Sequence, residues 1–469
     1  MQATEKSATA SFEKMRDLVR LDNTTSLSDR IKYLKALRKA VMDNIGALKQ
    51  ALDEDFDGRS PHETQVADIM PTITTIDYSI KNLRKWLKGE KKPTEIQFLP
   101  AKNRVEFHPK GVILIISPWN YPISLSLLPM ASAIAAGNRV ILKPSECTPK
   151  TSELMVQIVK SALPADRAMV FLGGPELSAK LTSLDFDHIV FTGSTRVGRM
   201  VMQSAANNLT PVTLELGGKS PAIVHEEYDL ELAASRIARG KLINAGQTCV
   251  APDYVMIPAN KIDNFVAFFK KSVHRFYPEF AGNGDYSSIV SQPQFERLIA
   301  LLDDAQKKGA KIIPLDEKNQ RSSGNRCLHP HLVLDISDDM KIAEEEIFGP
   351  ILIVVPYKNI DEASAYINQR PHPLSLYYFD DNPARVQDFL SKTISGGAVV
   401  NDTILQFVQE ALPFGGVGNS GMGVCHGYEG FRELSHAKSV FYQSKINGGF
   451  IIYPPYGKLF ERIMGFLVR

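Results

Sequence analysis

The stretch Val112-Ile-Leu-Ile-Ile-Ser117 begins with an unbroken apolar run that is rich in β-branched residues. A strand with one face in water alternates apolar and polar residues, so an unbroken run predicts a strand that is buried on both faces. Similar runs follow at 139–142, 168–172 and 188–192. Segments with helical periodicity separate most of them. Strands and helices that alternate at this spacing predict an α/β fold with a Rossmann-type parallel sheet.

The rest of the chain extends this pattern on both sides. Residues 11–87 carry apolar side chains at helical spacing, and 96–107 predicts a short exposed hairpin. A second cycle begins near Lys219, and its members are the candidate strands 222–224, 254–257, 351–355 and 398–400 and the candidate helices 261–276 and 293–308. Because 469 residues exceed what one core normally covers, we expect two α/β domains and a small β element.

The composition excludes several classes of protein. The 54 basic and 52 acidic side chains nearly cancel, and a net charge of +2 gives no reason to expect nucleic acid or an anionic membrane as a partner. Four scattered cysteines without a CxxC pair are too few for a disulfide framework. The first residues lead into an amphipathic helical pattern without the apolar core of a secretory signal. We therefore expect a cytoplasmic protein.

The segment Phe191-Thr-Gly-Ser-Thr-Arg-Val-Gly198 closes a predicted strand and opens a helix. Gly193 permits a tight turn, and the backbone N–H groups at a helix N-terminus suit a pyrophosphate. The glycine spacing is not GxGxxG, so an ordinary strand–helix turn is an equal alternative.

Two residues have the chemistry of a nucleophile and a base. Cys249 ends the segment Asn244-Ala-Gly-Gln-Thr-Cys249, a loop that can present a thiol beside free backbone N–H groups. A lone cysteine is more often a small buried hydrophobe. Glu215 lies in the apolar segment Thr213-Leu-Glu-Leu-Gly-Gly218, where burial would raise its pKa toward the range of a general base. A capping or ion-paired carboxylate is the structural alternative.

Two further polar segments follow predicted strands at their carboxyl ends, where open α/β sheets bind their ligands. In Ser117-Pro-Trp-Asn-Tyr-Pro122, Asn120 can donate its amide to a developing oxyanion or form an Asx turn. In Lys143-Pro-Ser-Glu146, Lys143 and Glu146 can bind ribose hydroxyls or form a solvated charged turn.

Taken together, seven ordered blocks resemble the aldehyde dehydrogenase superfamily over nearly the whole chain. The blocks are PWN at 118–120, KPSE at 143–146, FTGS at 191–194, ELGG at 215–218, GQTC at 246–249, EEIFGP at 345–350 and PFGGVGNSG at 413–421. Asn401-Asp-Thr403 and Gly423-Val-Cys-His-Gly427 are similar to the class 3 branch of that family. The segment 454–462 resembles its bacterial coniferyl aldehyde dehydrogenase-like members.

The resemblance implies an enzyme that oxidises an aldehyde to the carboxylic acid with NAD(P). Cys249 would attack the aldehyde carbon, and the Asn120 amide with the Cys249 backbone N–H would hold the oxyanion of the thiohemiacetal. Glu215 would then activate the water that hydrolyses the thioester. The residues implied for the cofactor are Lys143, Glu146, Gly193, Ser194, Gly198, Glu346 and Phe348. A carboxylate at Glu146 near the 2′-hydroxyl predicts NAD as the preferred cofactor and NADP as an accepted one.

The substrate is less constrained by the sequence. Trp119, Tyr121 and Phe414 can line an apolar funnel for an aromatic aldehyde such as coniferaldehyde, and ordinary core packing is equally open for each of them. Medium- or long-chain aliphatic aldehydes are the alternative substrates. The rival functions are a CoA-acylating dehydrogenase and a thiol hydrolase or acyl transferase that uses the same cysteine. A non-enzymatic scaffold would have no need of Cys249, Glu215 and Asn120 together.

The family also implies a division of the chain. We expect an NAD(P)-binding domain of 1–88 and 107–217, a catalytic domain of 218–412, and an oligomerisation hairpin and tail of 89–106 and 413–469. The hairpin and the branch predict a homodimer. The terminal segment can form an amphipathic helix that touches a membrane, although packing on the subunit's own surface or on its dimer partner is favoured. His329-Pro-His331 lacks a third ligand nearby, so we expect no metal site.

Overall fold

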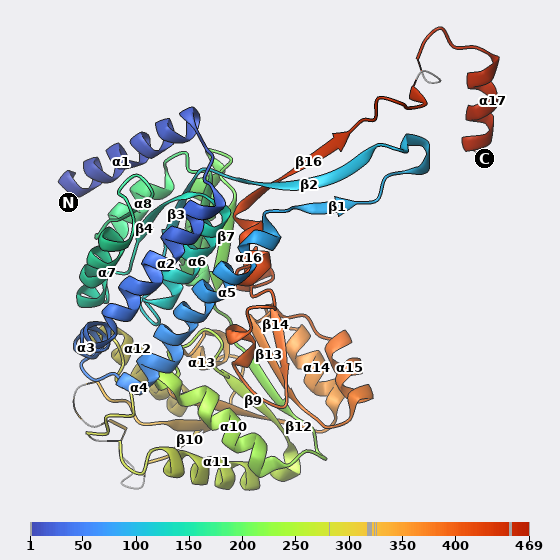
Figure 1. Ribbon diagram of the computed structural model, residues 1–469. Helices are drawn as coiled ribbons and strands as arrows, with labels where there is room; N and C mark the ends of the chain where they lie inside the picture. Colours follow the sequence, from blue (N-terminus) through green and yellow to red (C-terminus); the bar gives the residue numbers. More distant parts are fainter. Residues whose placement is uncertain are drawn as a thin grey trace.

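The computed structural model describes residues 2–280, 282–316, 321–322, 324, 326–449 and 453–468. The described chain forms two packed α/β bodies, from which a long β arm projects with the last helix at its far end (Figure 1). The two bodies correspond to the two strand–helix cycles of the sequence. Among the described residues, none of the helices is both long and apolar enough to cross a bilayer.

The first sheet is built around the run that opens at Val112. Its six strands lie in the order β15-β7-β6-β3-β4-β5, and all neighbours are parallel except β15, which is antiparallel to β7. The strands are β3 (Val112–Ile116), β4 (Arg139–Lys143), β5 (Ala168–Val170), β6 (His188–Gly193), β7 (Val212–Leu216) and β15 (Gly421–Met422). The predicted Rossmann-type parallel sheet is confirmed.

Both faces of this sheet are buried, as the unbroken apolar run requires. Ile113 and Ile115 of β3 belong to one core cluster, and Val112, Leu114 and Ile116 belong to the cluster on the opposite face. The helices of this body are α1 (Gln2–Leu21), α2 (Leu27–Asp43), α3 (Ile45–Phe56), α4 (Pro61–Glu63), the π-helix η1 (Thr64–Ile69), α5 (Met70–Trp86), α6 (Ser124–Ala136), α7 (Pro149–Ala162), α8 (Pro175–Thr182) and α9 (Thr195–Ala206). Of these, α1, α6, α7, α8 and α9 contact the strands, and the others pack mainly on neighbouring helices.

The second sheet has seven strands in the order β10-β11-β12-β9-β8-β13-β14, all parallel except the edge strand β10. The strands are β8 (Pro221–Val224), β9 (Tyr254–Pro258), β10 (Lys311–Pro314), β11 (His331–Leu334), β12 (Ile351–Tyr357), β13 (Ser375–Phe379) and β14 (Gly397–Val400). The helices of this body are α10 (Leu230–Leu242), α11 (Ile262–Phe276), α12 (Gln292–Lys307), α13 (Lys341–Glu344), α14 (Ile360–Asn368) and α15 (Pro383–Ser391). The four predicted strands of this cycle are present. The sequence pattern did not single out β10, β11 and β13.

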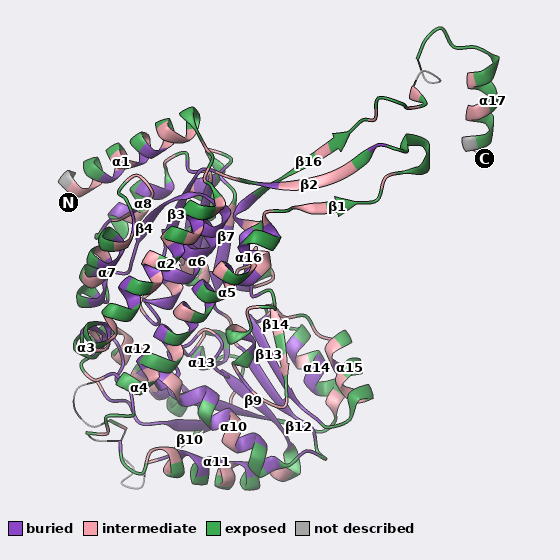
Figure 2. Cartoon of the chain, viewed as in Figure 1, coloured by how far each residue is buried: buried purple, intermediate pink, exposed green. Residues whose placement is uncertain are grey.

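The arm differs from the predicted short hairpin. Its strands are β1 (Glu90–Lys92), β2 (Lys102–Pro109) and β16 (Ser435–Tyr442), and β2 pairs with both of the others in antiparallel register. The hairpin therefore starts earlier than 96, and Ile96–Phe98 is a short 3₁₀ turn near its tip. Figure 2 shows that much of the arm is exposed, in contrast to the buried sheets. Two helices flank β16 in the chain, α16 (Gly427–Glu433) and α17 (Lys458–Leu467).

Candidate active site

Cys249 lies in a loop between α10 and β9 whose backbone is held in an unusual conformation. Asn244, Ala245 and Gly246 have successive positive φ angles of 52°, 49° and 73°. A Cβ at Gly246 would lie 2.2 Å from the carbonyl oxygen of Gly349, so only glycine fits there. The buried Gln247 side chain donates to the carbonyls of Asn244 and Ser288, both at 3.0 Å, and so ties the loop down. The loop thus presents Cys249 from a rigid support.

Cys249 and Glu215 line the same two cavities, although they come from different bodies of the protein. The large cavity has a volume of about 990 Å³, and the small cavity has a volume of about 30 Å³. Glu215 reaches both from the end of β7, beside the Gly217–Gly218 turn. The two side chains therefore mark the place where the two cavities meet.

Asn120 also lines the large cavity, from the loop that follows β3. Its Nδ2 donates to the carbonyl of Gln247 at 3.2 Å, which joins the Asn120 loop directly to the Cys249 loop. The structure therefore brings the predicted sulfur, amide and carboxyl group to one cavity. Asn120 follows β3, Glu215 lies near the end of β7, and Cys249 precedes β9, so the cavity lies where these three segments meet.

Burial sets the protonation of the two reactive groups. It raises the pKa of Glu215 to about 8, and repulsion from Glu433 adds to the rise, while the neighbouring Cys425 thiol opposes it. Neither carboxylate oxygen of Glu215 has a hydrogen-bond partner among the described residues. Burial, together with the carboxylates of Glu346 and Glu215, also raises the pKa of the Cys249 thiol to about 12. In this state the thiol keeps its proton at neutral pH.

The part of the large cavity at the start of α9 is suited to an anion. Helix α9 begins after Ser194, whose Oγ accepts from the backbone N–H of Val197 at 3.4 Å. Gly193, Ser194, Arg196 and Arg199 all line this wall. Free N–H groups at a helix start and two guanidinium groups favour negative charge. The two arginines were not among the predicted residues, because their position relative to the cavity depends on the phase of the helix.

The remaining predicted cofactor residues fall into two groups. Gly198 packs α9 closely on β7, since a Cβ there would lie 2.6 Å from Leu216, and Glu346 and Phe348 line the large cavity. Lys143 and Glu146 form an ion pair of 2.6 Å at the end of β4, but they are not among the described residues that line this cavity.

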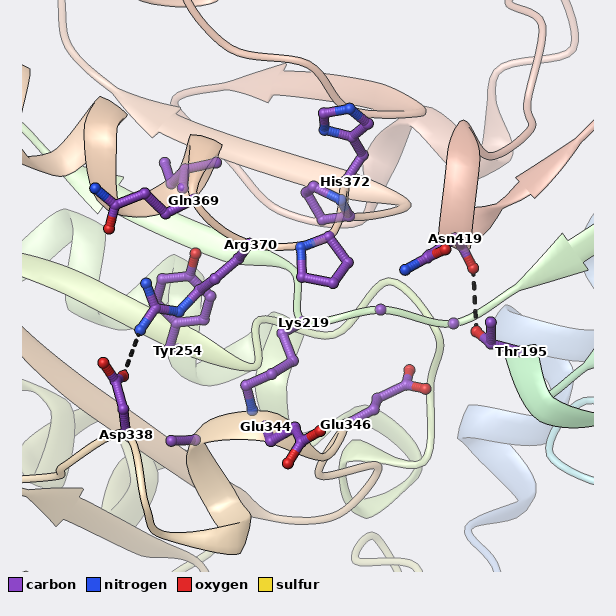
Figure 3. Close-up of a pocket in the computed structure, with 16 residues that line it drawn as sticks. Thr195, Lys219, Tyr254, Asp338, Glu344, Glu346, Gln369, Arg370, His372 and Asn419 are labelled. Atoms are coloured by element: carbon purple, nitrogen blue, oxygen red, sulfur yellow. Dashed lines mark hydrogen bonds and ion pairs between the residues drawn. The ribbon is translucent and has the colours of Figure 1, made fainter.

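A third cavity of about 630 Å³ shares Glu346 with the large cavity (Figure 3). Lys219 and Arg370 line it, and each already has an acidic partner: Lys219 pairs with Asp253, and Arg370 pairs with Asp338 at 2.7 Å. Burial raises the pKa of Glu346 itself to about 7, and the nearby Asp253 adds to the effect.

The predicted funnel residues are separated in the structure. Phe414 lines the small cavity, whereas Trp119 lines the large one, where its ring lies edge-on to Phe348 at 5.3 Å. Tyr121 lines neither cavity: it is buried and hydrogen-bonded through its hydroxyl to Thr248 at 2.7 Å. Tyr121 therefore has the position of a packed core residue, which was the alternative to its predicted place in the funnel.

Two side chains of the small cavity carried no assigned role in the sequence. Cys425 and His426 line it beside Phe407 and Phe414, and the His426 ring lies 5.0 Å from Phe407 and 5.3 Å from Phe414. Burial lowers the pKa of His426 to about 4, so its ring is neutral. The motif Gly423-Val-Cys-His-Gly427 marked this segment but did not show that it packs against Glu215.

Comparisons with known proteins agree with this geometry. The model of the aldehyde dehydrogenase family matches residues 1–440. A probable coniferyl aldehyde dehydrogenase of Pseudomonas aeruginosa is 48% identical over 93% of this chain and 91% of its own length. A dimeric NADP-preferring aldehyde dehydrogenase of Mus musculus is 38% identical over 92% of this chain and 94% of its own length. The solved substrate-bound state of Staphylococcus aureus AldH superposes with a TM-score of 0.92 at 37% identity, over 98% of this chain and 99% of that one.

Proposed function

This chain belongs to the aldehyde dehydrogenase family and oxidises aldehydes to carboxylic acids with NAD(P), and we propose that Cys249, Asn120 and Glu215 carry the reaction. The observation that supports this assignment is that all three side chains line the large cavity. A thiol, an amide and a buried carboxyl group are the three functions that acyl chemistry on an aldehyde needs.

In the proposed mechanism, Cys249 gives up its thiol proton to solvent, and the thiolate attacks the aldehyde carbon to form a thiohemiacetal. The Asn120 amide and the Cys249 backbone N–H donate hydrogen bonds to its oxyanion. When bound, NAD(P)⁺ would supply a positive charge that favours the thiolate and would accept the hydride that the thiohemiacetal carbon loses as the thioester of Cys249 forms. Glu215 takes a proton from the water that attacks this thioester, and the carboxylic acid leaves while the Cys249 thiolate is regenerated.

The large cavity suits a dinucleotide. Its volume of about 990 Å³ lies at the upper end of the range of about 300–1,000 Å³ for ligand pockets. We propose that Ser194, Arg196 and Arg199 bind the pyrophosphate at the start of α9. Gly193 and Gly198 shape this wall, and Glu346 and Phe348 hold the nicotinamide end.

For the adenosine ribose we propose Lys143 and Glu146, with NAD preferred and NADP accepted. The Glu146 carboxylate is about half exposed at the end of β4, where it would disfavour a 2′-phosphate. The measurement is kcat/KM with each cofactor, and a higher value with NADP contradicts the proposed preference.

For the substrate we propose an aromatic aldehyde of the coniferaldehyde type, with medium- or long-chain aliphatic aldehydes as the alternative. The P. aeruginosa relative carries the name of a probable coniferyl aldehyde dehydrogenase. Phe407 and Phe414 line the small cavity, and aromatic side chains of this kind can pack against an aromatic substrate ring. A kcat/KM panel of aromatic and aliphatic aldehydes separates the two classes. Supplying CoA in the same assay tests the CoA-acylating alternative, because acyl-CoA would then replace the free acid.

We also propose a homodimer that forms through the β arm, in a protein of the cytoplasm. The arm exposes apolar side chains at Ile96, Leu99 and Phe441, which a second copy would cover. The molar mass in solution tests this assembly, and a monomer at micromolar concentration contradicts it. The alternative role of α17 is contact with a membrane. Flotation of the protein with liposomes, with and without residues 456–469, tests this alternative.

A further inference from the structure

We propose that a buried ion pair, Arg59–Asp68, sets the position of the oxyanion-binding amide of Asn120, an inference that rests on the proposed role of Asn120. Arg59 precedes α4, and Asp68 lies in the π-helix η1, so both come from the N-terminal helical layer. Neither residue lines the large or the small cavity. Both act on the loop of residues 117–123, Arg59 at its centre and Asp68 at its C-terminal end.

Arg59 holds the loop at Asn120 itself. Its side chain is completely buried, and Nη1 donates to the backbone carbonyl of Asn120 at 2.7 Å. The guanidinium carbon lies 4.7 Å from the ring centre of Phe56 and 5.2 Å from that of Tyr121. The cation is therefore stacked between two aromatic rings and aimed at one carbonyl oxygen.

Asp68 holds the C-terminal end of the same loop. Its completely buried carboxylate accepts from the backbone N–H groups of Ile123, at 3.5 Å, and Ser124, where α6 begins. Its Oδ2 lies 4.0 Å from Nη2 of Arg59. A carboxylate at a helix N-terminus stabilises both the helix and its own charge. The π-helix turn that carries Asp68 is a feature that is frequent at functional sites.

The same carbonyl of Asn120 also connects to the nucleophile loop. Asn244 donates to it through Nδ2 at 3.1 Å, and the backbone N–H of Asn244 donates to Glu63 at 3.0 Å. Glu63 accepts a further hydrogen bond from Ser287 at 2.7 Å. One oxygen atom thus receives donors from Arg59 and from the Cys249 loop, so a shift of Arg59 would move the amide relative to the sulfur.

Stability alone does not explain this pair. Replacing a buried ion pair with apolar residues is often neutral or stabilising, because desolvation opposes the Coulomb gain. Here the charged groups are 4.0 Å apart, and Nε and Nη2 of Arg59 have no hydrogen-bond partner among the described residues. What the arginine does achieve is one short hydrogen bond to the residue that carries the proposed oxyanion donor. A misplacement of about 1 Å in an active site can cost about 100-fold in rate.

The test is a double-mutant cycle with Arg59→Met and Asn120→Ala. We expect Arg59→Met to lower kcat about 10- to 100-fold with the KM for NAD within about twofold, and Asn120→Ala to lower kcat about 100-fold or more. In the Asn120→Ala background, Arg59→Met should have little further effect, because the amide that it positions is gone. Arg59→Lys should recover part of the loss, and it serves as the reporter if the methionine variant does not fold.

Arg30 offers a matched control. It is also a buried arginine in the helical layer, and its Nη1 donates to the carbonyl of Ala135 at 2.9 Å, at the other end of α6. Arg30→Met should lower the melting temperature and leave kcat near that of the parent. Full kcat in Arg59→Met, or losses that multiply in the double variant, would overturn the positioning role. Normal kcat in Asn120→Ala would instead overturn the proposed function on which it rests.

Discussion

The two cavities that meet at Cys249 differ in both size and lining. The large cavity, of about 990 Å³, carries Arg196, Arg199 and Glu346 on its walls. The small cavity, of about 30 Å³, is walled mainly by apolar side chains such as Phe407 and Phe414.

This difference separates two ways of binding. A dinucleotide is large and charged, so its site must offer fixed dipoles and cations before it arrives. An aldehyde is held mainly by apolar contact, and the small cavity offers such contact through Phe407 and Phe414. Under the proposed mechanism Cys249 and Glu215 would act on both ligands, because both residues line both cavities.

The largest expected effect comes from removing the sulfur at that junction. Cys249→Ala should lower turnover at least about 10⁴-fold, since the covalent route is lost. NAD should still bind, because the wall that carries Ser194, Arg196 and Arg199 is unchanged. NADH absorbance measures the first effect and fluorescence titration the second. Substantial aldehyde oxidation by this variant would remove Cys249 from its role.

Replacing the carboxyl group should separate the two half-reactions. Glu215→Gln should give a burst of NADH near one equivalent and then a steady state about 10²- to 10⁴-fold slower, because thioester hydrolysis loses its base. Rapid-mixing absorbance resolves the burst. Normal steady-state turnover would mean that another group activates the water.

A change confined to the small cavity should affect only the aldehyde. Phe414→Ala should lower kcat/KM for aromatic aldehydes about tenfold, since a wall of the pocket is lost. The KM for NAD should stay within about twofold, because Phe414 does not line the large cavity. An equal change in both KM values would break the distinction between the two sides.

The smallest expected effect is a shift in the pH profile. Glu215 must be deprotonated to act as a base, and its pKa is raised to about 8, so kcat for hydrolysis should increase as pH rises through about 8. Glu433→Gln removes a negative charge that contributes to this rise, so the inflection should move to lower pH. A profile that is flat between pH 6 and about 9 would mean that Glu215 does not limit the reaction.

The sequence was a good guide to several buried strands, although it did not single out β11 and β13, which are also buried throughout. The apolar runs predicted β3, β4 and β6 because both faces of each strand are covered. The half-exposed edge strand β10 and the exposed strand β16 lacked such a pattern, since partner strands rather than burial define them. The predicted hairpin was too short because its register depends on β16, which lies far along the chain.

The sequence by itself determined the α/β class, the two strand–helix cycles and the residue types of the site, including Cys249, Glu215 and Asn120. Only the tertiary structure decided which neighbours these residues have. It placed Trp119 on the wall of the large cavity and Cys425 beside Glu215, and it joined Arg59 to Asn120 across 61 positions of the chain. The physical reason is that periodicity records whether a side chain is buried, whereas its partners are set by how helices pack on sheets.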